Sequence, residues 1–171
     1  MAADNTVLVE TLVAFGNDVV ERAQRNLGAT RRVKGKNRRA VASGNLKNSL
    51  TFSLRKTGEG YTIQFKARGT AAKYAEVIED GRRAGAKAPP IEPILAWIKL
   101  KNIKARDEKG RILEQTESRK RGLAFAIARG IGKNGIEAVK YFENAYNDAI
   151  EEREPDIYKA LTEYLNKRFE K

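Results

Sequence analysis

Residues 49–68 decide the fold of this chain, because they read SLTFSLRKTGEGYTIQFKAR, two alternating segments around a glycine-containing turn. Every second residue in each segment is apolar, as in a β-strand with one buried face. The apolar positions are Leu50, Phe52 and Leu54 in the first segment and Tyr61, Ile63, Phe65 and Ala67 in the second. With a turn at residues 58–60, they predict an antiparallel hairpin. A hairpin is only marginally stable alone, so it must pack on a helix or on further strands.

Residues 6–27, ahead of the hairpin, predict the helix that covers it. Apolar residues recur there at spacings of three and four, which places them in one stripe on a helix. They are Leu8, Leu12, Phe15, Val19, Ala23 and Leu27. Asn5 or Thr6 is placed to cap the start of this helix, and Gly28 is placed to end it in a left-handed conformation.

The second half of the chain predicts further helices joined by polar loops. The spacing of apolar residues places a short helix at 91–98, an alanine-rich helix at 118–131 and a third helix at 139–150. Pro155 predicts a break, because proline lacks the N–H that a helix interior needs. A last helix then forms a C-terminal extension at about 155–171.

These elements predict a single α+β domain over residues 1–171, in which a small antiparallel sheet packs against the N-terminal helix and several C-terminal helices. A chain of 171 residues is long enough for one domain with an arm or a tail. Three polar segments fall outside this core. They are a basic arm or loop at about 29–45 and two exposed loops, at 80–90 and 104–117.

The composition excludes several classes of function. The chain has 34 Lys and Arg against 22 Asp and Glu, a formal net charge of +12, and it contains no His and no Cys. It therefore has no Ser-His-Asp or Cys-His catalysis, no disulfide, and no conventional zinc, haem or iron–sulfur site, and we expect no cofactor. No apolar run approaches the roughly 20 residues that span a bilayer. Residues 1–6 lack the basic start of a signal peptide, so we expect a soluble protein made inside the cell, with no membrane partner.

Most of the positive charge lies in the middle of the chain. Residues 31–133 carry 26 basic and nine acidic side chains, whereas both ends are mildly acidic. The candidate contact residues are Arg31, Arg32, Lys34, Lys36, Arg38, Arg39, Arg82, Arg83 and Lys87. Like charges at the density of residues 31–39 resist compaction, so we expect an extended or mobile arm there. One interpretation is an arm that orders on DNA or on an acidic protein surface, and the other is a solvated loop.

One acidic cluster raises the question of metal-dependent catalysis. Glu76, Glu79 and Asp80 lie close together, and a Mg²⁺-dependent nuclease would need such oxygen ligands. Arg82 and Arg83 follow at once. Salt bridges to these two residues are the simpler interpretation of the cluster.

Two other patterns also have simpler structural interpretations. Residues 130–135 match G-x-G-x-x-G, but a dinucleotide site needs a strand before the motif, whereas here a helix precedes it. We interpret this motif as a glycine-rich helix end. Phe52, Tyr61 and Phe65 would stack on bases if they lay on an exposed sheet face. Because the alternation places two of the three on the buried face, we interpret them as core residues. Trp97, beside Ile94 and Ile98, is also interpreted as a core residue.

Several short motifs occur in one order along the chain. They are SGNLKNSL at 43–50, YAEVIEDG at 74–81, an Arg-rich Gly/Pro loop at 82–90, ILAWI at 94–98, AIAR at 126–129 and Gly135-Ile136. The first is a small-Gly-x-Leu-basic-x-Ser-apolar lead into the sheet, and the second fits Tyr-Ala-x-x-x-Glu-x-Gly residue by residue. In this order, over about residues 6–150, the chain resembles the head–tail joining and tail-completion (neck) proteins of long-tailed bacteriophages.

The resemblance implies an α+β virion subunit that assembles as a homo-oligomeric ring, of six or twelve copies, at the neck or the top of the tail. Such rings connect the portal and its adaptors to the tail-tube or tail-terminator proteins, and packaged DNA passes through the lumen. None of these proteins is an enzyme. The resemblance also implies synthesis in the host cytoplasm and residence in the virion.

Three functional hypotheses follow from the sequence. The first is the head–tail joining ring. The second is a free, sequence-nonspecific DNA-binding protein that uses the basic arm, and the third is a Mg²⁺-dependent nuclease.

Overall fold

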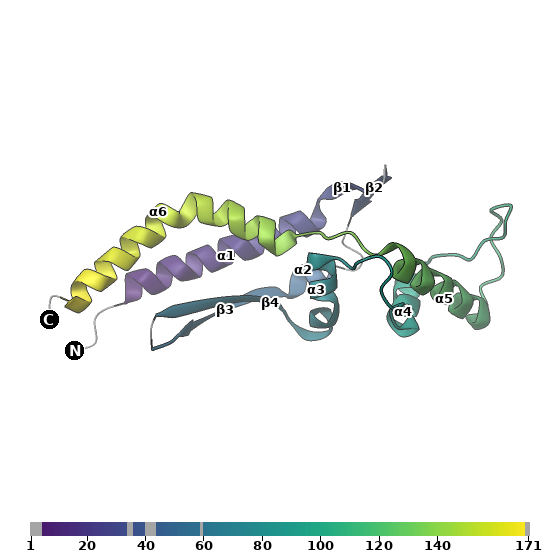
Figure 1. The fold of residues 1–171 in the computed structure, drawn as a ribbon, viewed down its shortest axis with the longest axis horizontal. Helices are drawn as coiled ribbons and strands as arrows, with labels where there is room; N and C mark the ends of the chain where they lie inside the picture. Colours follow the sequence, from purple (N-terminus) through teal and green to yellow (C-terminus); the bar gives the residue numbers. More distant parts are fainter. Residues whose placement is uncertain (1–4, 34–35, 40–43, 59, 170–171) are drawn as a thin grey trace.

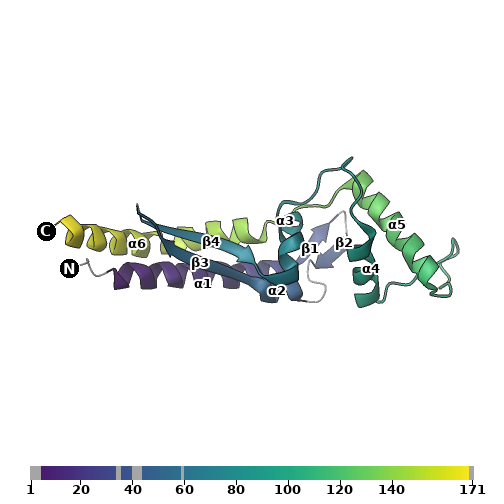
Figure 2. The same ribbon diagram turned by 90° about the horizontal axis from the view of Figure 1, so that it is seen from below.

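The protein has an elongated α+β fold, described by a computed structural model over residues 5–33, 36–39, 44–58 and 60–169 (Figure 1). Two long helices lie along each other over a β-hairpin, and two shorter helices form the end of the molecule that lies away from both termini (Figures 1 and 2). In chain order the elements are α1 (Thr6–Gly28), β1 (Thr30–Val33), β2 (Lys36–Arg39), α2 (Asn45–Ser49), β3 (Leu50–Lys56), β4 (Tyr61–Ala67), the 3₁₀ turn η1 (Gly69–Ala71), α3 (Ala72–Asp80), α4 (Ile91–Leu100), α5 (Glu117–Asn134) and α6 (Tyr141–Phe169). The predicted fold class is confirmed.

The predicted hairpin is present, and it packs against α1. β3 and β4 pair antiparallel, with Leu50 opposite Ala67 and Phe52 opposite Phe65. The rings of Phe52 and Phe65 lie 6.2 Å apart between centroids. Phe52 also lies against Gly16 of α1, where a Cβ atom would clash with the ring, so this glycine lets the sheet approach the helix closely. The core interpretation is therefore confirmed for Phe52, which contacts α1, and for Phe65, which packs against the buried cluster, whereas Tyr61 is only partly buried at the start of β4.

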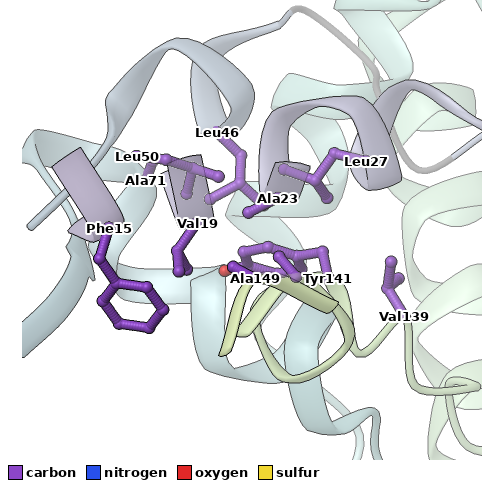
Figure 3. Packing of buried hydrophobic residues seen from close by; sticks show 11 residues of the cluster. Phe15, Val19, Ala23, Leu27, Leu46, Leu50, Ala71, Val139, Tyr141 and Ala149 are labelled. Carbon is purple, nitrogen blue, oxygen red and sulfur yellow. The ribbon is translucent and has the colours of Figure 1, made fainter. Parts of the chain in front are cut away.

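The main core lies where α1, the hairpin, α3 and α6 meet, and Figure 3 shows its buried side chains. Val19, Leu27 and Tyr141 are among its fully buried members. Burial of side chains of this size contributes about 1.5–3 kcal/mol each. The Tyr141 hydroxyl donates to the Ala75 carbonyl oxygen of α3 at 3.3 Å, which satisfies the one polar group of this side chain. The other buried members are Phe15, Ala23, Leu46, Leu50, Ala71, Val139, Ala145 and Ala149.

The predicted break at Pro155 is wrong, because α6 runs without interruption from Tyr141 to Phe169. Proline removes one backbone hydrogen bond and crowds the preceding turn, which bends a helix more often than it ends one when tertiary packing holds both halves. Here Ala149 and Ala160, on the two sides of Pro155, are both buried. Figure 1 shows α6 curving along α1. The C-terminal extension is thus the second half of α6.

The first helix has neither the side-chain cap nor the left-handed stop that were predicted for its two ends. Asn5 occupies the N-cap position, but its side chain makes no capping bond. Its Nδ2 donates instead to the Tyr61 hydroxyl, which ties the start of α1 to the hairpin. Gly28 is the last helical residue, and the chain leaves through Ala29 in an extended conformation, with φ −66°. The left-handed stop is absent because the chain continues directly into β1.

A second, smaller core lies between α4 and α5, which form a lobe of residues 91–134. Its fully buried side chains are two isoleucines and two alanines, Ile94, Ile98, Ala124 and Ala128. Trp97 does not join them, contrary to the prediction, and remains 41% exposed. The reason is geometric, because Ile94 and Ile98 already occupy the face of α4 that meets α5.

The lobe is joined to the rest of the molecule by two chain segments, 81–90 and 135–140, which we call the connector (Figure 2). Arg82 N donates to the Ile136 carbonyl oxygen and Ile136 N donates to the Arg82 carbonyl oxygen, both at 2.8 Å. Gly85 N also donates to the Gly132 carbonyl oxygen at 2.9 Å. The connector is therefore a short antiparallel pairing of two distant parts of the chain.

Two glycines make this close pairing possible. Gly81 and Gly135 have φ values of 73° and 71°, in the region that L side chains rarely adopt. A Cβ atom on Gly81 would lie 2.5 Å from the Ile136 carbonyl oxygen, and one on Gly135 would clash with the Arg82 carbonyl oxygen. Gly135 also ends α5, which confirms the interpretation of residues 130–135 as a glycine-rich helix end.

Candidate binding surface

The net positive charge is concentrated at the end of the molecule that lies away from the termini. Residues 81–135 carry 14 basic and five acidic side chains, and residues 29–45 carry six basic side chains and no acidic one. The rest of the chain has a net charge of −3. Figures 1 and 2 both place β1, β2, α4 and α5 in the same half of the molecule. We call residues 29–45 and 81–135 together the basic end.

The predicted basic arm forms a second two-stranded sheet. β1 and β2 pair antiparallel, with Arg31 opposite Arg38 and Arg32 opposite Asn37. The extended backbone agrees with the prediction, whereas the pairing was not expected from the charge density. Like charges placed opposite each other destabilise a sheet, and a bound anionic group would relieve this repulsion. Lys36 and Arg39 are placed in β2 by their backbone, and Lys34 lies outside the described residues.

Two of the predicted contact residues bind backbone of the connector. The guanidinium of Arg31 donates to the Ala138 carbonyl oxygen at 3.3 Å. The guanidinium of Arg82 donates to the Lys87 carbonyl oxygen. Both side chains are partly buried, and each has a buried Nε with no hydrogen-bond partner. Arg31 therefore ties β1 to the connector and Arg82 holds the loop at 82–87 together, in addition to any contact with a partner.

Three other predicted contact residues are free to meet a partner. Arg32, Arg83 and Lys87 are exposed, and no ion pair of theirs occurs within the described residues. Arg83 and Lys87 lie on the connector segment before α4, whereas Arg32 lies on β1. The structure thus brings the members of the predicted set that it describes to one half of the molecule, with Arg31 and Arg82 bound to backbone and Arg32, Arg83 and Lys87 exposed.

Sequence reasoning missed a further basic stripe, on α5. Arg121, Phe125 and Arg129 recur every four residues, are all exposed, and lie on one side of α5, next to the buried face that carries Ala124 and Ala128. Phe125 is 58% exposed. The signal in the sequence is the spacing R-x-x-x-F-x-x-x-R, which overlaps the apolar stripe of the same helix.

The acidic cluster has a structural role that differs from the expected one. The carboxylate of Glu79 accepts from Phe142 N at 3.0 Å and from Glu143 N at 2.9 Å, and so caps the start of α6. Asp80 pairs with Lys140 at 2.9 Å. The expected salt bridges to Arg82 and Arg83 are absent from the described residues, so that interpretation is wrong. Within the same residues no group of three or more His, Cys, Asp or Glu side chains could hold a metal ion.

Most of α6, up to residue 163, forms an acidic surface alongside α1. Residues 143–163 carry seven acidic and two basic side chains. Asp18, on α1, pairs with Arg22 at 2.8 Å and with Arg153 of α6 at 3.4 Å. The hydrogen bond from Arg22 is the main cause that holds the pKa of Asp18 below its ordinary value. Arg22 also pairs with Glu152, so a network of charges joins α1 to α6.

A shallow groove lies between α1 and α6 beside this acidic surface. The groove is lined from α1 by Val7, Thr11 and Ala14, and from α6 by Arg153, Asp156, Lys159, Ala160 and Glu163. Asp156 and Glu163 are exposed and form no ion pair within the described part of the chain. This groove lies at the opposite end of the molecule from α5 (Figure 1).

The structure contains no helix, within the residues it describes, that is long and apolar enough to cross a membrane. Comparison of the chain with family models, with curated proteins and with solved structures found no match.

Proposed function

We propose that the protein is a structural subunit of the head–tail junction of a long-tailed bacteriophage. In this role it forms a homo-oligomeric ring of six or twelve copies in the neck or upper tail of the virion. The ring connects the portal and its adaptors to the tail-tube or tail-terminator proteins, and packaged DNA passes through its lumen. The function is mechanical joining, without catalysis or a cofactor.

The observation that carries this proposal is the separation of two unlike surfaces within one subunit. The basic end, with a net charge of +15, lies away from the termini, whereas residues 143–163 of α6, with seven acidic and two basic side chains, lie alongside α1. Surfaces that differ in this way attract each other between copies. A head-to-tail contact of two different surfaces generates a closed ring when the rotation between copies closes. The order of the neck-protein motifs along the chain supports the same role.

The exposed cations suit a passage for DNA. A lumen through which the whole genome moves must contact phosphates without reading bases. Arg32, Arg83 and Lys87 are exposed on a loop and a strand edge, where they contact phosphate without entering a groove. These contacts would weaken with rising salt, as expected of phosphate contacts.

Assembly with neck partners tests this function. The purified protein would be mixed with the portal, adaptor and tail-tube proteins of the same phage, and the mass of each species measured by mass photometry. We expect a cyclic oligomer of defined copy number, alone or on a partner. A protein that stays monomeric both alone and with every partner would contradict the proposal.

The second candidate is a free, sequence-nonspecific DNA-binding protein, and the pairing of cations across β1 and β2 favours it. It predicts duplex binding with a steep salt dependence, whose slope falls by about one for each phosphate contact removed. Replacement of the six basic residues by serine should then abolish binding, and unchanged binding would rule the assignment out. The six are Arg31, Arg32, Lys34, Lys36, Arg38 and Arg39.

A further inference from the structure

The stripe on α5 has the properties of a contact surface for another protein. Phe125 is 58% exposed and stands between Arg121 and Arg129, each one helical turn away. Neither guanidinium forms an ion pair within the described residues. Gly122 and Ala126, which are exposed beside Phe125, leave room for a second helix to approach. An exposed aromatic residue between two arginines is typical of interface anchors.

The groove between α1 and α6 has the complementary properties. Two small apolar residues line it, Ala14 of α1, which is exposed, and Ala160 of α6, which is 4% exposed. Asp156 and Glu163 lie on the α6 side, before and after Ala160. Both carboxylates are exposed and have no internal partner among the described residues. The groove thus offers an apolar seat between two carboxylates.

The spacings of the two surfaces agree. On α5 each arginine lies four residues from Phe125, about 6 Å along the helix axis. On α6 Asp156 lies four residues and Glu163 three residues from Ala160, about 6 Å and about 4.5 Å along the axis. One aromatic ring on Ala160 would therefore place an arginine near each carboxylate.

We propose that α5 of one copy docks in the α1–α6 groove of a second copy, with Phe125 on Ala160 and with Arg121 and Arg129 paired to Asp156 and Glu163. This inference rests on the proposed ring and names its subunit contact. Because α5 and the groove lie at opposite ends of the molecule, the contact is head-to-tail and repeats from copy to copy (Figures 1 and 2).

DNA is the other occupant that the charge of α5 suggests, and the observations favour protein. Phosphate contacts use the cations and leave the aromatic ring exposed to water. A groove with two exposed carboxylates at matching spacing lies on the same chain, beside Arg153 and Lys159, and it accounts for both parts of the stripe. DNA binding by α5 is therefore an outcome that the experiment must exclude.

The experiment compares the full-length chain with charge-reversal variants by sedimentation velocity, from micromolar to submillimolar protein. We expect self-association of the wild type, and a dissociation constant raised by about tenfold or more in Arg121→Glu/Arg129→Glu and in Asp156→Arg/Glu163→Arg. Lys104→Glu/Lys109→Glu is the matched control, because both lysines are exposed on the same lobe outside the stripe. Lys159 lines the groove with the wrong charge, so Lys159→Glu should strengthen association.

Mixing the two defective variants gives a sharper result. In the mixture, the α5 of each variant is complementary in charge to the groove of the other variant, so together they should recover the association that neither shows alone. A single chain that carries both charge reversals should recover the association of the wild type. Recovery of the wild-type dissociation constant requires both surfaces to be folded, because misfolded chains would not restore one defined contact.

The outcomes separate this inference from the proposed function. A wild type that stays monomeric throughout, or variants that associate like the control, would overturn the inference. If rings still form on the neck partners in that case, the proposed function stands and the contact lies elsewhere. Loss of duplex DNA binding in Arg121→Glu/Arg129→Glu, with self-association unchanged, would assign α5 to nucleic acid and overturn the inference as well.

Discussion

The body of the molecule, formed by α1, α2, α3, α6 and the β3–β4 hairpin, and the α4–α5 lobe are built on different principles. The body buries large side chains such as Leu27 and Tyr141 in one continuous core. The lobe buries two isoleucines and two alanines, and exposes Trp97, Leu100 and Phe125. The body has a small net negative charge, whereas the lobe and its connector are strongly basic.

This difference indicates a division of tasks. Buried apolar area supplies most of the stability of a fold, so the body holds the molecule together. A small core between two helices supplies little, and regions with few buried contacts open at lower free energy than the global unfolding transition. The lobe is therefore free to carry exposed apolar and charged side chains, which are costly in a core and useful at an interface.

The largest effect should come from shortening one buried side chain in each region. Leu27 and Ile98 are both 1% exposed. We expect Leu27→Ala to lower the global free energy of unfolding by about 3–4 kcal/mol, because it opens a cavity in the main core. We expect Ile98→Ala to lower the free energy of opening of the lobe, measured by amide hydrogen exchange, by about 2–4 kcal/mol. The unfolding transition of the body should not change. Thermal unfolding measures the global effect and hydrogen exchange measures the local effect in the lobe. If both variants lowered the global stability equally, lobe and body would be one cooperative unit.

The connector can be weakened separately from either core. Gly135→Ala places a side chain at a positive φ and against the Arg82 carbonyl oxygen, so we expect a loss of about 2–4 kcal/mol. Gly85→Ala is the control, because its φ is also positive, at 78°, but nothing lies within 4 Å of the added atom. This control should cost only about 1 kcal/mol. Denaturant unfolding compares the two, and equal losses would mean that the connector does not constrain the lobe.

Acid should weaken the body through Asp18. Pairing with Arg22 lowers the pKa of Asp18 in the folded protein. The ionised carboxylate therefore stabilises the fold at a pH above its pKa in the unfolded chain, about 3.9. This stabilisation is lost as the pH falls through the lower pKa of the folded state. Asp18→Asn should cost about 1–2 kcal/mol at pH 7, and its difference from the wild type should shrink between pH 5 and about 2. Urea unfolding across this range tests it, and a difference independent of pH would contradict the assignment.

The smallest effect on stability should come from Phe125→Ser. The side chain is 58% exposed and belongs to no core, so the free energy of unfolding should change by less than about 0.5 kcal/mol. Self-association should nevertheless weaken. Calorimetry and sedimentation of the same sample separate the two effects, and a large loss of stability would place Phe125 in the lobe core instead of at an interface.

Local patterns were sufficient to predict the elements with a strong period. The alternation at residues 49–68 gave the hairpin, and the stripe from Leu8 to Leu27 gave α1, of which Leu12 alone is only partly buried. These patterns succeed because one face of each element meets the same core along its whole length.

Features that depend on distant partners could not be predicted in the same way. Pro155 reads as a break, but α1 packs along both halves of α6 and keeps it continuous. Glu79 reads as a salt-bridge partner of the next residues, but it caps a helix that begins more than sixty residues later. For the candidate surface, the sequence identified Arg32 and Arg83 as exposed contacts, but the anchoring of Arg31 required knowledge of where residue 138 lies.

The central claim is that the body supplies stability and the lobe joins one copy to the next. Hydrogen exchange of the wild-type chain, free and in its assembled state, tests it most directly. We predict that amides of α4 and α5 exchange faster than those of α1 and α6 in the free chain. On assembly, α5 and residues 153–163 should gain protection together. Equal exchange of lobe and body in the free chain, or assembly without added protection of α5, would contradict the account.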